Sequence, residues 1–565
     1  IGFDAMINER RTEASRSILI QVNSEKSFPE LHNYCSQFGK INGAHHYCIQ
    51  EDNLHYILIE YSHEDEANTV LKSSVYNEDT PNVPTRSQFL WFRAGSLGGK
   101  KSKMKLESND ACLTVEDGTS IMTEETLHSL LMAAETINDQ ILILHRSTCL
   151  NDVGIRLRFM AAKQIETSLI GMFPDARAYP FGSSVNGFGK LGCDLDLILR
   201  LDKESSGLAA NDSYSRLVFH TKASFGNGRS QVQRQMESIG DMLQLFLPGV
   251  NHVRRILQAR VPIIKYHHEH LDLEIDLSMG NMTGVYMSEL LYMFGQLDAR
   301  VQPLTFCIRK WAQYVGLTNP SPGRWITNFS LTMLVIFFLQ QHNQPILPPI
   351  NTLINKARKE DLRITEDQIS CTFLRDLNQL NFTTTNDDNV ADLLFQFFEY
   401  YSQFDFSDRA ISVNLGKIIL KPDHSAMYIV NPLETAMNVS KNVSLEEAER
   451  FRMEVRNAAW ILESSLQSKT KQKSVNNWGL LNIFRTPQQS IIKPQMFFKP
   501  RMMEISDLFG NDAAAAATTP RKYKNETIRQ QIADIQKSTK AAINLKANSQ
   551  NNSVEMKQKT RVRRR

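Results

Sequence analysis

Two aspartates separated by one residue are the part of this chain best suited to chemistry. Asp194 and Asp196 lie in Cys193-Asp-Leu-Asp-Leu-Ile-Leu199, where apolar and acidic residues alternate. Alternation predicts a β-strand, in which side chains two residues apart point to the same face. Neighbouring carboxylates repel each other unless a cation lies between them, and hard oxygen ligands suit magnesium. The alternative is a surface strand with two solvated aspartates.

A turn of small residues precedes this predicted strand. It consists of Gly182, Ser183 and Ser184, and Phe181, directly before it, is included in the candidate nucleotide site. Such a turn can end one strand and begin a helix, whose free N–H groups and hydroxyls suit a polyphosphate. The turn and the paired aspartates together indicate nucleotidyl transfer. Gly187-Phe-Gly-Lys-Leu-Gly192 matches the dinucleotide fingerprint in its letters, but it precedes a strand instead of opening a helix, so we interpret it as a connection.

These parts resemble the polymerase-beta-like nucleotidyltransferases, whose pattern is Gly-Ser, a short helix, Asp-x-Asp on the next strand and a third aspartate on a later strand. The third carboxylate is expected within Val261–Ser278, which is typical of a hairpin with its second strand from Leu271 to Leu277. Asp272, Glu274 and Asp276 all alternate onto one face of that strand, so periodicity does not choose among them. The family pattern selects Asp276.

The resemblance implies two-metal chemistry with Mg²⁺ or Mn²⁺. Asp194 and Asp196 would hold both ions, and Asp276 would ligate the catalytic ion and help to deprotonate the attacking hydroxyl. The neighbouring cluster His267-His-Glu-His270 offers other metal-ligand types. Consecutive residues in a turn point in divergent directions, so we expect no metal site there.

Later segments resemble the non-template poly(A) and poly(U) polymerases. Arg300–Gln313 resembles a helix that ends in Lys-x-Trp-Ala-Lys, which implies a triphosphate contact for Arg309, while Gln313 lacks the second charge and Trp311 is expected in the core. A second segment, Gly323–Leu339, resembles a helix start that places Asn328 on a phosphate and Phe329 on the base. A third, Ile429–Val439, resembles the nucleotide-recognition motif of PAP-associated domains.

The last motif bears on base choice. Related uridylyltransferases carry a histidine where Met437 stands, and an apolar, adaptable methionine should accept adenine, so we predict ATP as the substrate. The resemblance makes Glu434 a base-edge acceptor and gives the Ser288 hydroxyl a contact to sugar or base, while Met287 replaces a ribose-contacting asparagine. The alternative is that Pro432-Leu-Glu is only a structural loop and that specificity is set elsewhere.

The N-terminal region has its own pattern. Residues 15–94 are predicted to run strand, helix, strand, strand, helix, strand, which resembles a degenerate RNA-recognition motif. Leu19 and Leu58 occupy positions where such domains stack bases on aromatics, and only Tyr56 remains as a possible platform. We therefore favour a sheet that buries its face against protein, in a dimerisation or interaction role, over direct base reading.

The composition is that of a globular protein. The chain has 565 residues, 42% hydrophobic residues and a formal net charge of +3, which predicts two or three domains and does not by itself argue for nucleic acid. Seven scattered cysteines without a Cys-x-x-Cys pair fit reduced thiols. The longest apolar run, Phe329–Leu339, is too short to cross a bilayer, so we expect no membrane partner and a buried helix instead.

Both ends of the chain carry charge patterns. The first residues include Asp4, Glu9 and Glu13, unlike acid-poor transit peptides, so no transit peptide is expected in this chain. From Arg521 to Arg565 basic residues dominate, which favours either a nucleic-acid-binding tail or a solvated disordered one.

The expected class is α+β: a degenerate RRM-like domain, a polymerase-beta-like nucleotidyltransferase palm, a mostly helical PAP-associated domain and a disordered basic tail. The expected boundaries are 15–94 for the first domain, 95–119 for a linker, 120–284 for the palm with a helical lead-in, 285–480 for the helical domain and 510–565 for the tail.

The order of these parts resembles the mitochondrial group of poly(A) polymerases. That resemblance implies a mitochondrial matrix enzyme that adds adenylates to RNA 3′ ends and forms a homodimer through its N-terminal domain. The alternatives are a terminal uridylyltransferase on the same fold and a catalytically silent RNA-binding adaptor, which would not need three clustered carboxylates.

Overall fold

The computed structural model describes residues 1–76, 85–93, 112–201, 228–321, 323–467 and 477–484. The predicted tail, 510–565, lies outside these residues, as does most of the predicted linker, 95–119. No described helix has the length and apolar character needed to cross a membrane.

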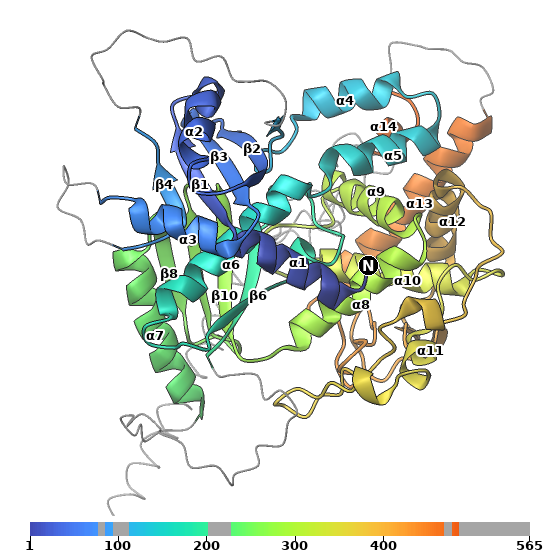
Figure 1. The fold of residues 1–565 in the computed structure, drawn as a ribbon. Helices are drawn as coiled ribbons and strands as arrows, with labels where there is room; N and C mark the ends of the chain where they lie inside the picture. The colour runs from blue at the N-terminus through green and yellow to red at the C-terminus, as the bar shows by residue number, and fades with distance from the viewer. Residues whose placement is uncertain (77–84, 94–111, 202–227, 322, 468–476, 485–565) are drawn as a thin grey trace, which may run out of the picture. The chain divides into compact units, whose positions relative to one another are not determined.

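The N-terminal region forms a five-stranded sheet in the order β4-β1-β3-β2-β5 (Figure 1). The predicted succession of strands and helices over 15–94 is present, and a preceding helix and a fifth strand are added to it. The elements are α1 (Phe3–Ser15), β1 (Ser17–Val22), α2 (Phe28–Cys35), β2 (Ile41–Ile49), β3 (Leu54–Tyr61), α3 (Glu64–Ser73), β4 (Phe89–Trp91) and β5 (Leu113–Val115).

Both faces of this sheet are used in packing. Ile18 and Ile57 belong to a core with residues of α2 and α3, whereas Leu19, Tyr56 and Leu58 alternate onto the opposite face and are buried in the core of the next domain. The prediction that the sheet buries its face against protein is confirmed. The alternative role of Tyr56 as a base platform is wrong, because only 2% of this residue is exposed.

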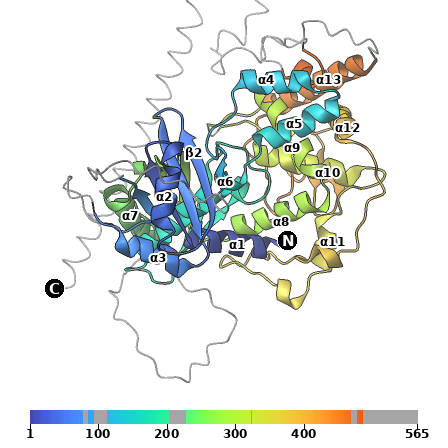
Figure 2. The ribbon, with the colours of Figure 1, turned by 45° about the horizontal axis from the view of Figure 1, so that its top comes forward.

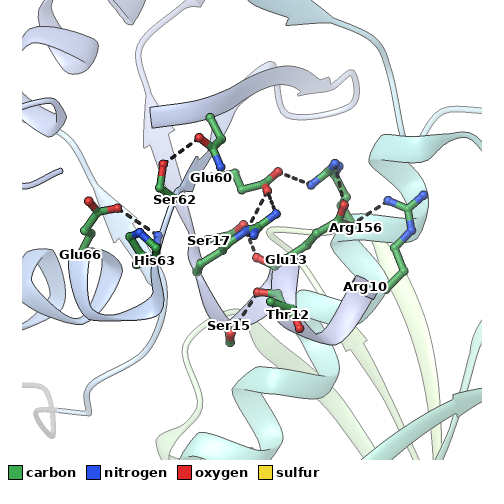
Figure 3. Close-up of polar contacts among 12 residues, drawn as sticks. Arg10, Thr12, Glu13, Ser15, Ser17, Glu60, Ser62, His63, Glu66 and Arg156 are labelled. Carbon is green, nitrogen blue, oxygen red and sulfur yellow. Dashed lines mark hydrogen bonds and ion pairs between the residues drawn. The ribbon is translucent and has the colours of Figure 1, made fainter. Parts of the chain in front are cut away.

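Polar contacts fix the same interface. The Tyr47 hydroxyl donates to the backbone carbonyl of His270, and the Tyr56 hydroxyl lies 3.1 Å from the His270 Nδ1. Arg156 lies between two acids of the N-terminal region, with its guanidinium 2.6 Å from Glu60 and 3.1 Å from Glu13 (Figure 3).

The palm contains a second five-stranded sheet in the order β6-β7-β10-β9-β8. Strands β7 and β10 are parallel, and the other neighbours are antiparallel. Helices α6 and α7 bury apolar side chains against one face, and α7 lies beside β8 (Figure 1). The elements are α6 (Asp152–Leu169), β6 (Arg177–Phe181), β7 (Leu195–Arg200), α7 (Gly228–Phe246), β8 (Val250–Ile256), β9 (Ile263–His268) and β10 (Leu273–Met279).

The hairpin expected within Val261–Ser278 is formed by β9 and β10, with one correction. Asp272 does not alternate with Glu274 and Asp276 along the strand, because it lies in the turn before β10 with φ of 45°. The left-handed conformation of a turn residue explains why periodicity misplaced it.

The helical domain packs around a central helix buried on all sides. This is α10 (Asn328–Gln341), which confirms the expected buried helix, and α9 (Val301–Tyr314) contacts both α10 and α12 (Figure 2). Trp311 is 1% exposed and packs edge-on against Phe398, as expected for a core residue. The remaining elements are α8 (Thr283–Leu297), α11 (Ile350–Asn355), α12 (Val390–Gln403), β11 (Arg409–Ser412), β12 (Lys417–Leu420), α13 (Leu445–Gln467) and α14 (Leu480–Ile483).

Two helices that precede the palm sheet in sequence belong to this helical core. They are α4 (Glu124–Ala133) and α5 (Ile137–Thr148), which contribute Leu127 and Ile141 to the same cluster of buried side chains as α9 and α10. The helical lead-in predicted before the palm therefore packs as part of the helical core.

Candidate active site

The structure brings the three predicted aspartates to neighbouring strands. Asp196 lies on β7, Asp194 directly precedes that strand, and Asp276 lies opposite Asp196 in the parallel pairing of β7 with β10. Residues directly opposite on neighbouring strands project to the same face. Burial, followed by the nearby carboxylates, raises the pKa of Asp194 and raises that of Asp196 to about 7. Around Asp194 and Asp196, positive charge therefore does not offset the effects of burial and of the neighbouring acids on the pKa.

Lys265 is a member of this site that the sequence analysis missed. It lies on β9 opposite Asp276, and its Nζ is 2.8 Å from Oδ1 and 2.9 Å from Oδ2 of that residue. Burial opposes its charge, but the hydrogen bond and the charge of Asp276 outweigh burial and raise the pKa of Lys265. The sequence offered one signal for its position: Lys265 alternates with Ile264 and Tyr266, which both face the core, so its side chain must point to the opposite face.

The donor set fits a hard divalent cation. Carboxylate oxygens are the ligands that Mg²⁺ and Mn²⁺ prefer. As placed, no three His, Cys, Asp or Glu side chains among the described residues converge closely enough to hold an ion. Asp276 faces Lys265, so this carboxylate must turn from the ammonium to serve as a ligand.

The His267–His270 segment is used for packing. His268 is fully buried, with its Nε2 3.0 Å from the Oε1 of Gln164, and His270 contacts Tyr56 of the N-terminal sheet. His268 also packs its ring against Phe89 of β4, so both histidines contact the N-terminal domain from the palm.

The turn after β6 lies at the edge of the aspartate cluster. Gly182 has φ of +68°, and a Cβ at this position would lie 3.0 Å from the Oδ2 of Asp196, so both conformation and space favour glycine. Its N–H donates to the hydroxyl of Ser288 at 2.7 Å. Ser183 is half-buried, whereas Phe181 lies opposite Asp196 and would clash with a side chain at Gly284.

Two of the predicted nucleotide contacts also have protein partners. Ser288 is 1% exposed, and its hydroxyl donates to the Gly284 carbonyl and accepts from the Gly182 N–H, so in this structure it holds the turn. Ser184 is also buried, and its hydroxyl accepts from Arg158 Nε at 3.2 Å. Both serines thereby help to hold the turn that contains Gly182 and Ser183.

Arg158 is the second residue that sequence reasoning missed. This arginine is 2% exposed and donates to Ser184, to the Gly154 carbonyl and to the carbonyl of Cys193, the residue before Asp194. Arg158 thereby holds both ends of the loop that runs from Ser184 to Cys193. In the sequence, the only signal was its position between the apolar residues Leu157 and Phe159.

Arg309 connects the palm to the helical domain. Its guanidinium donates to the Phe188 carbonyl at 2.7 Å and to the Thr332 hydroxyl, and it lies 5.7 Å from the centre of the Phe188 ring. Burial lowers its pKa to about 10, so the group stays charged at neutral pH. Gln313, one turn later, is exposed.

The predicted base-recognition residues lie near the start of α10. Asn328 is exposed and Phe329 half-buried in its first turn. The neighbouring Ser330 is joined to Ser440 by a hydroxyl–hydroxyl contact of 3.0 Å, which brings the nucleotide-recognition motif to this helix start. Glu434 and Met437 are half-buried and close their own turn through a backbone hydrogen bond of 2.7 Å.

Comparisons with known proteins agree with this architecture. The family model described as "Poly(A) RNA polymerase, mitochondrial-like, central palm domain" matches residues 137–296, that of "Cid1 family poly A polymerase" matches 389–445, and that of the RL domain matches 2–75.

Two relatives and two crystal structures are similar over most of the chain. Poly(A) RNA polymerase, mitochondrial, of Drosophila melanogaster is 56% identical over 96% of this chain and 90% of the relative, and the Homo sapiens protein of that name is 36% identical over 85% and 80%. The crystal structures of mtPAP in apo form and in complex with ATPγS match 86% of this chain and 100% of theirs at 32% identity, with TM-scores of 0.77 and 0.75.

The sheet, the glycine turn and the in-register aspartates define a nucleotidyltransferase palm. Within that class, the chain belongs to the mitochondrial poly(A) RNA polymerase family.

Proposed function

We propose that this protein adds adenylates from ATP, without a template, to the 3′ end of RNA. The observation that carries this proposal is the pairing of Asp196 with Asp276 beside the Gly182 turn, in a chain of this family. A protein that only bound RNA would have no need of Asp276 placed where its charge helps to raise the pKa values of Asp194 and Asp196.

The chain's own residues support the reaction by position and charge. Gly182 and Ser183 would receive the triphosphate, with Asn328 as a further contact, while Arg158, Ser184 and Ser288 hold that loop in place. Arg309 keeps the palm loop against α10 and adds positive charge beside the phosphates. Phe329 would stack on the base.

Asp194, Asp196 and Asp276 would hold Mg²⁺ or Mn²⁺, which when bound supplies charge stabilisation to the attacking and leaving oxygens. Asp276 also lies where it can accept the proton of the RNA 3′-hydroxyl before attack on the α-phosphate. Pyrophosphate then leaves toward the Gly182 turn.

Base choice is a separate part of the proposal. Crystal structures of mtPAP exist with ATPγS and also with UTP, GTP and CTP, so nucleotide binding alone does not define the substrate of that relative. For this chain we propose adenine, because Met437 presents an apolar surface and Glu434 can accept a hydrogen bond from the exocyclic amine. Terminal uridylyl transfer is the second candidate on the same fold.

The test is extension of a labelled RNA oligonucleotide with each NTP separately, in Mg²⁺ and then in Mn²⁺. A ladder mainly with ATP is the expected result. A ladder mainly with UTP would overturn the base choice and leave the mechanism, and no ladder with any nucleotide from folded protein would overturn the enzymatic function.

We also propose a homodimer built through the N-terminal domain and a location in the mitochondrial matrix. Relatives are named as mitochondrial proteins. Because both faces of the N-terminal sheet are covered, its edge strands β4 and β5 are the parts left for pairing, and Trp91 on β4 is 53% exposed. Sedimentation of wild type and Trp91→Ala, and protease protection in isolated mitochondria, test the two proposals.

A further inference from the structure

A row of side chains crosses the palm sheet on the face opposite α6 and α7. Each member of the row lies directly opposite the next on the neighbouring strand. In strand order, the members are Phe181, Asp196, Asp276, Lys265 and Arg254. Directly opposite residues project to one face, so two acids in this row are followed by two cations.

The alternation of β8 supports this placement. Arg255, the next residue, points to the other face, where it forms an ion pair of 2.6 Å with Asp241 of α7. Arg254 therefore points away from α7. It is exposed and forms no hydrogen bond or ion pair with another side chain of the described residues. Its charge has no structural task that the fold reveals.

The order of the strands indicates what approaches these cations. The Gly182 turn follows β6, at one end of the row, and Arg254 lies on the edge strand at the other end. In-line displacement places the attacking oxygen opposite the leaving pyrophosphate. If the triphosphate lies at the Gly182 end, the RNA strand must come from the side of β9 and β8.

We propose that Lys265 and Arg254 form a track that binds the phosphodiester backbone at the 3′ end of the RNA substrate. This inference rests on the proposed function. Neighbouring strands are roughly 5 Å apart, so Arg254 lies about 10 Å from Asp276 across the sheet, within reach of the last nucleotides of a strand whose terminal hydroxyl is at Asp276. Phosphate contacts of this kind position a strand without reading its sequence.

The test compares Arg254→Ala with Arg234→Ala, since Arg234 is an exposed arginine on α7, at the opposite face. Binding of a short labelled oligoadenylate is measured by fluorescence anisotropy over a salt series, and the KM for ATP is measured separately. Arg254→Ala is expected to weaken RNA binding about tenfold, as for a lost charged hydrogen bond, and to reduce the slope of log K against log salt by about 0.7. The KM for ATP should not change, and Arg234→Ala should behave as wild type.

Two negative results are distinguishable. If wild type extends RNA and Arg254→Ala binds the oligonucleotide as tightly as Arg234→Ala, the track is wrong and the proposed function stands. If folded wild type neither binds nor extends RNA, both fail. Arg254→Lys is expected to retain most of the binding, which separates a phosphate contact from a change of local structure.

Discussion

At the scale of single residues, the site depends on a few side chains that hold others in place. The acids were visible in the sequence, but Arg158, Lys265 and Ser288 act by holding the groups around them. Such positioning residues matter because an error of about 1 Å in a reacting group can cost roughly a hundredfold in rate.

Gly182 provides the first prediction. Gly182→Ala forces a left-handed backbone on alanine and brings its Cβ to 3.0 Å from the Asp196 carboxylate. We expect kcat for RNA extension to fall roughly ten- to a hundredfold, with a small loss of thermal stability. Gly171→Ala is the matched control, because nothing lies within 4 Å of its added Cβ. Equal rates of RNA extension for the two variants would contradict the close approach of the Gly182 backbone to the Asp196 carboxylate.

Asp196 provides a prediction on pH. Burial and the neighbouring carboxylates raise its pKa to about 7, above its ordinary value in the unfolded chain. The folded state therefore keeps a proton that the unfolded state releases, so the metal-free protein should lose stability as pH rises from about 4 to about 7.

Cations compete with that proton. The melting temperature gained on addition of MnCl₂ should accordingly be small at pH 6 and larger at pH 8, as followed by differential scanning fluorimetry. Asp196→Asn removes the titrating group, and its gain should be small at both pH values. An equal gain for wild type at pH 6 and pH 8 would be evidence against a proton on this cluster.

At the scale of elements, helix α6 joins the N-terminal domain to the catalytic loop. Arg156 and Arg158 lie two residues apart on it and point in different directions. Arg156 points to Glu13 and Glu60 (Figure 3), and Arg158 donates to the Cys193 carbonyl. Docking of the N-terminal domain and placement of the aspartates thus share one rigid element.

Arg156→Met tests the docking contacts. Glu60 and Glu13 are 7% and 10% exposed in their side chains, and each would lose one of two arginine partners, because Arg16 still pairs with Glu60 and Arg10 with Glu13. We expect the free energy of unfolding to fall by about 2 kcal/mol, measured by chemical denaturation. Arg452→Met, which removes an exposed ion pair, should cost less than about 1 kcal/mol. If Arg156→Met lowers the free energy of unfolding no more than Arg452→Met does, Arg156 does not stabilise the docking of the N-terminal domain on the palm.

The elements also show what sequence can and cannot predict. β7 and its acids were predictable because alternation is local, and so was the covered face of the N-terminal sheet, from Leu19 and Leu58. The partner of Tyr56 was not predictable, because His270 lies 214 residues away in the sequence. The family resemblance predicted a nucleotide contact for Ser288. It could not predict the hydrogen bond that Ser288 accepts from Gly182, which lies 106 residues away in the sequence.

At the scale of the whole molecule, the N-terminal domain packs against the palm and supports it, as far as the described residues show. Its aromatic side chains Tyr47 and Tyr56 are buried at the palm, so these two rings are unavailable for base stacking with RNA. The cations beside Asp276 on the palm sheet are suited to binding the RNA strand.

The measurement that tests the account most directly is extension of labelled RNA with ATP by wild type and by Asp276→Asn, with circular dichroism to show that both are folded. Asn keeps the shape of the side chain and removes the charge shared with Asp196 and Lys265. The account predicts an ATP-dependent ladder for wild type and none above background for the variant. A folded Asp276→Asn protein that extends RNA at the wild-type rate would contradict it.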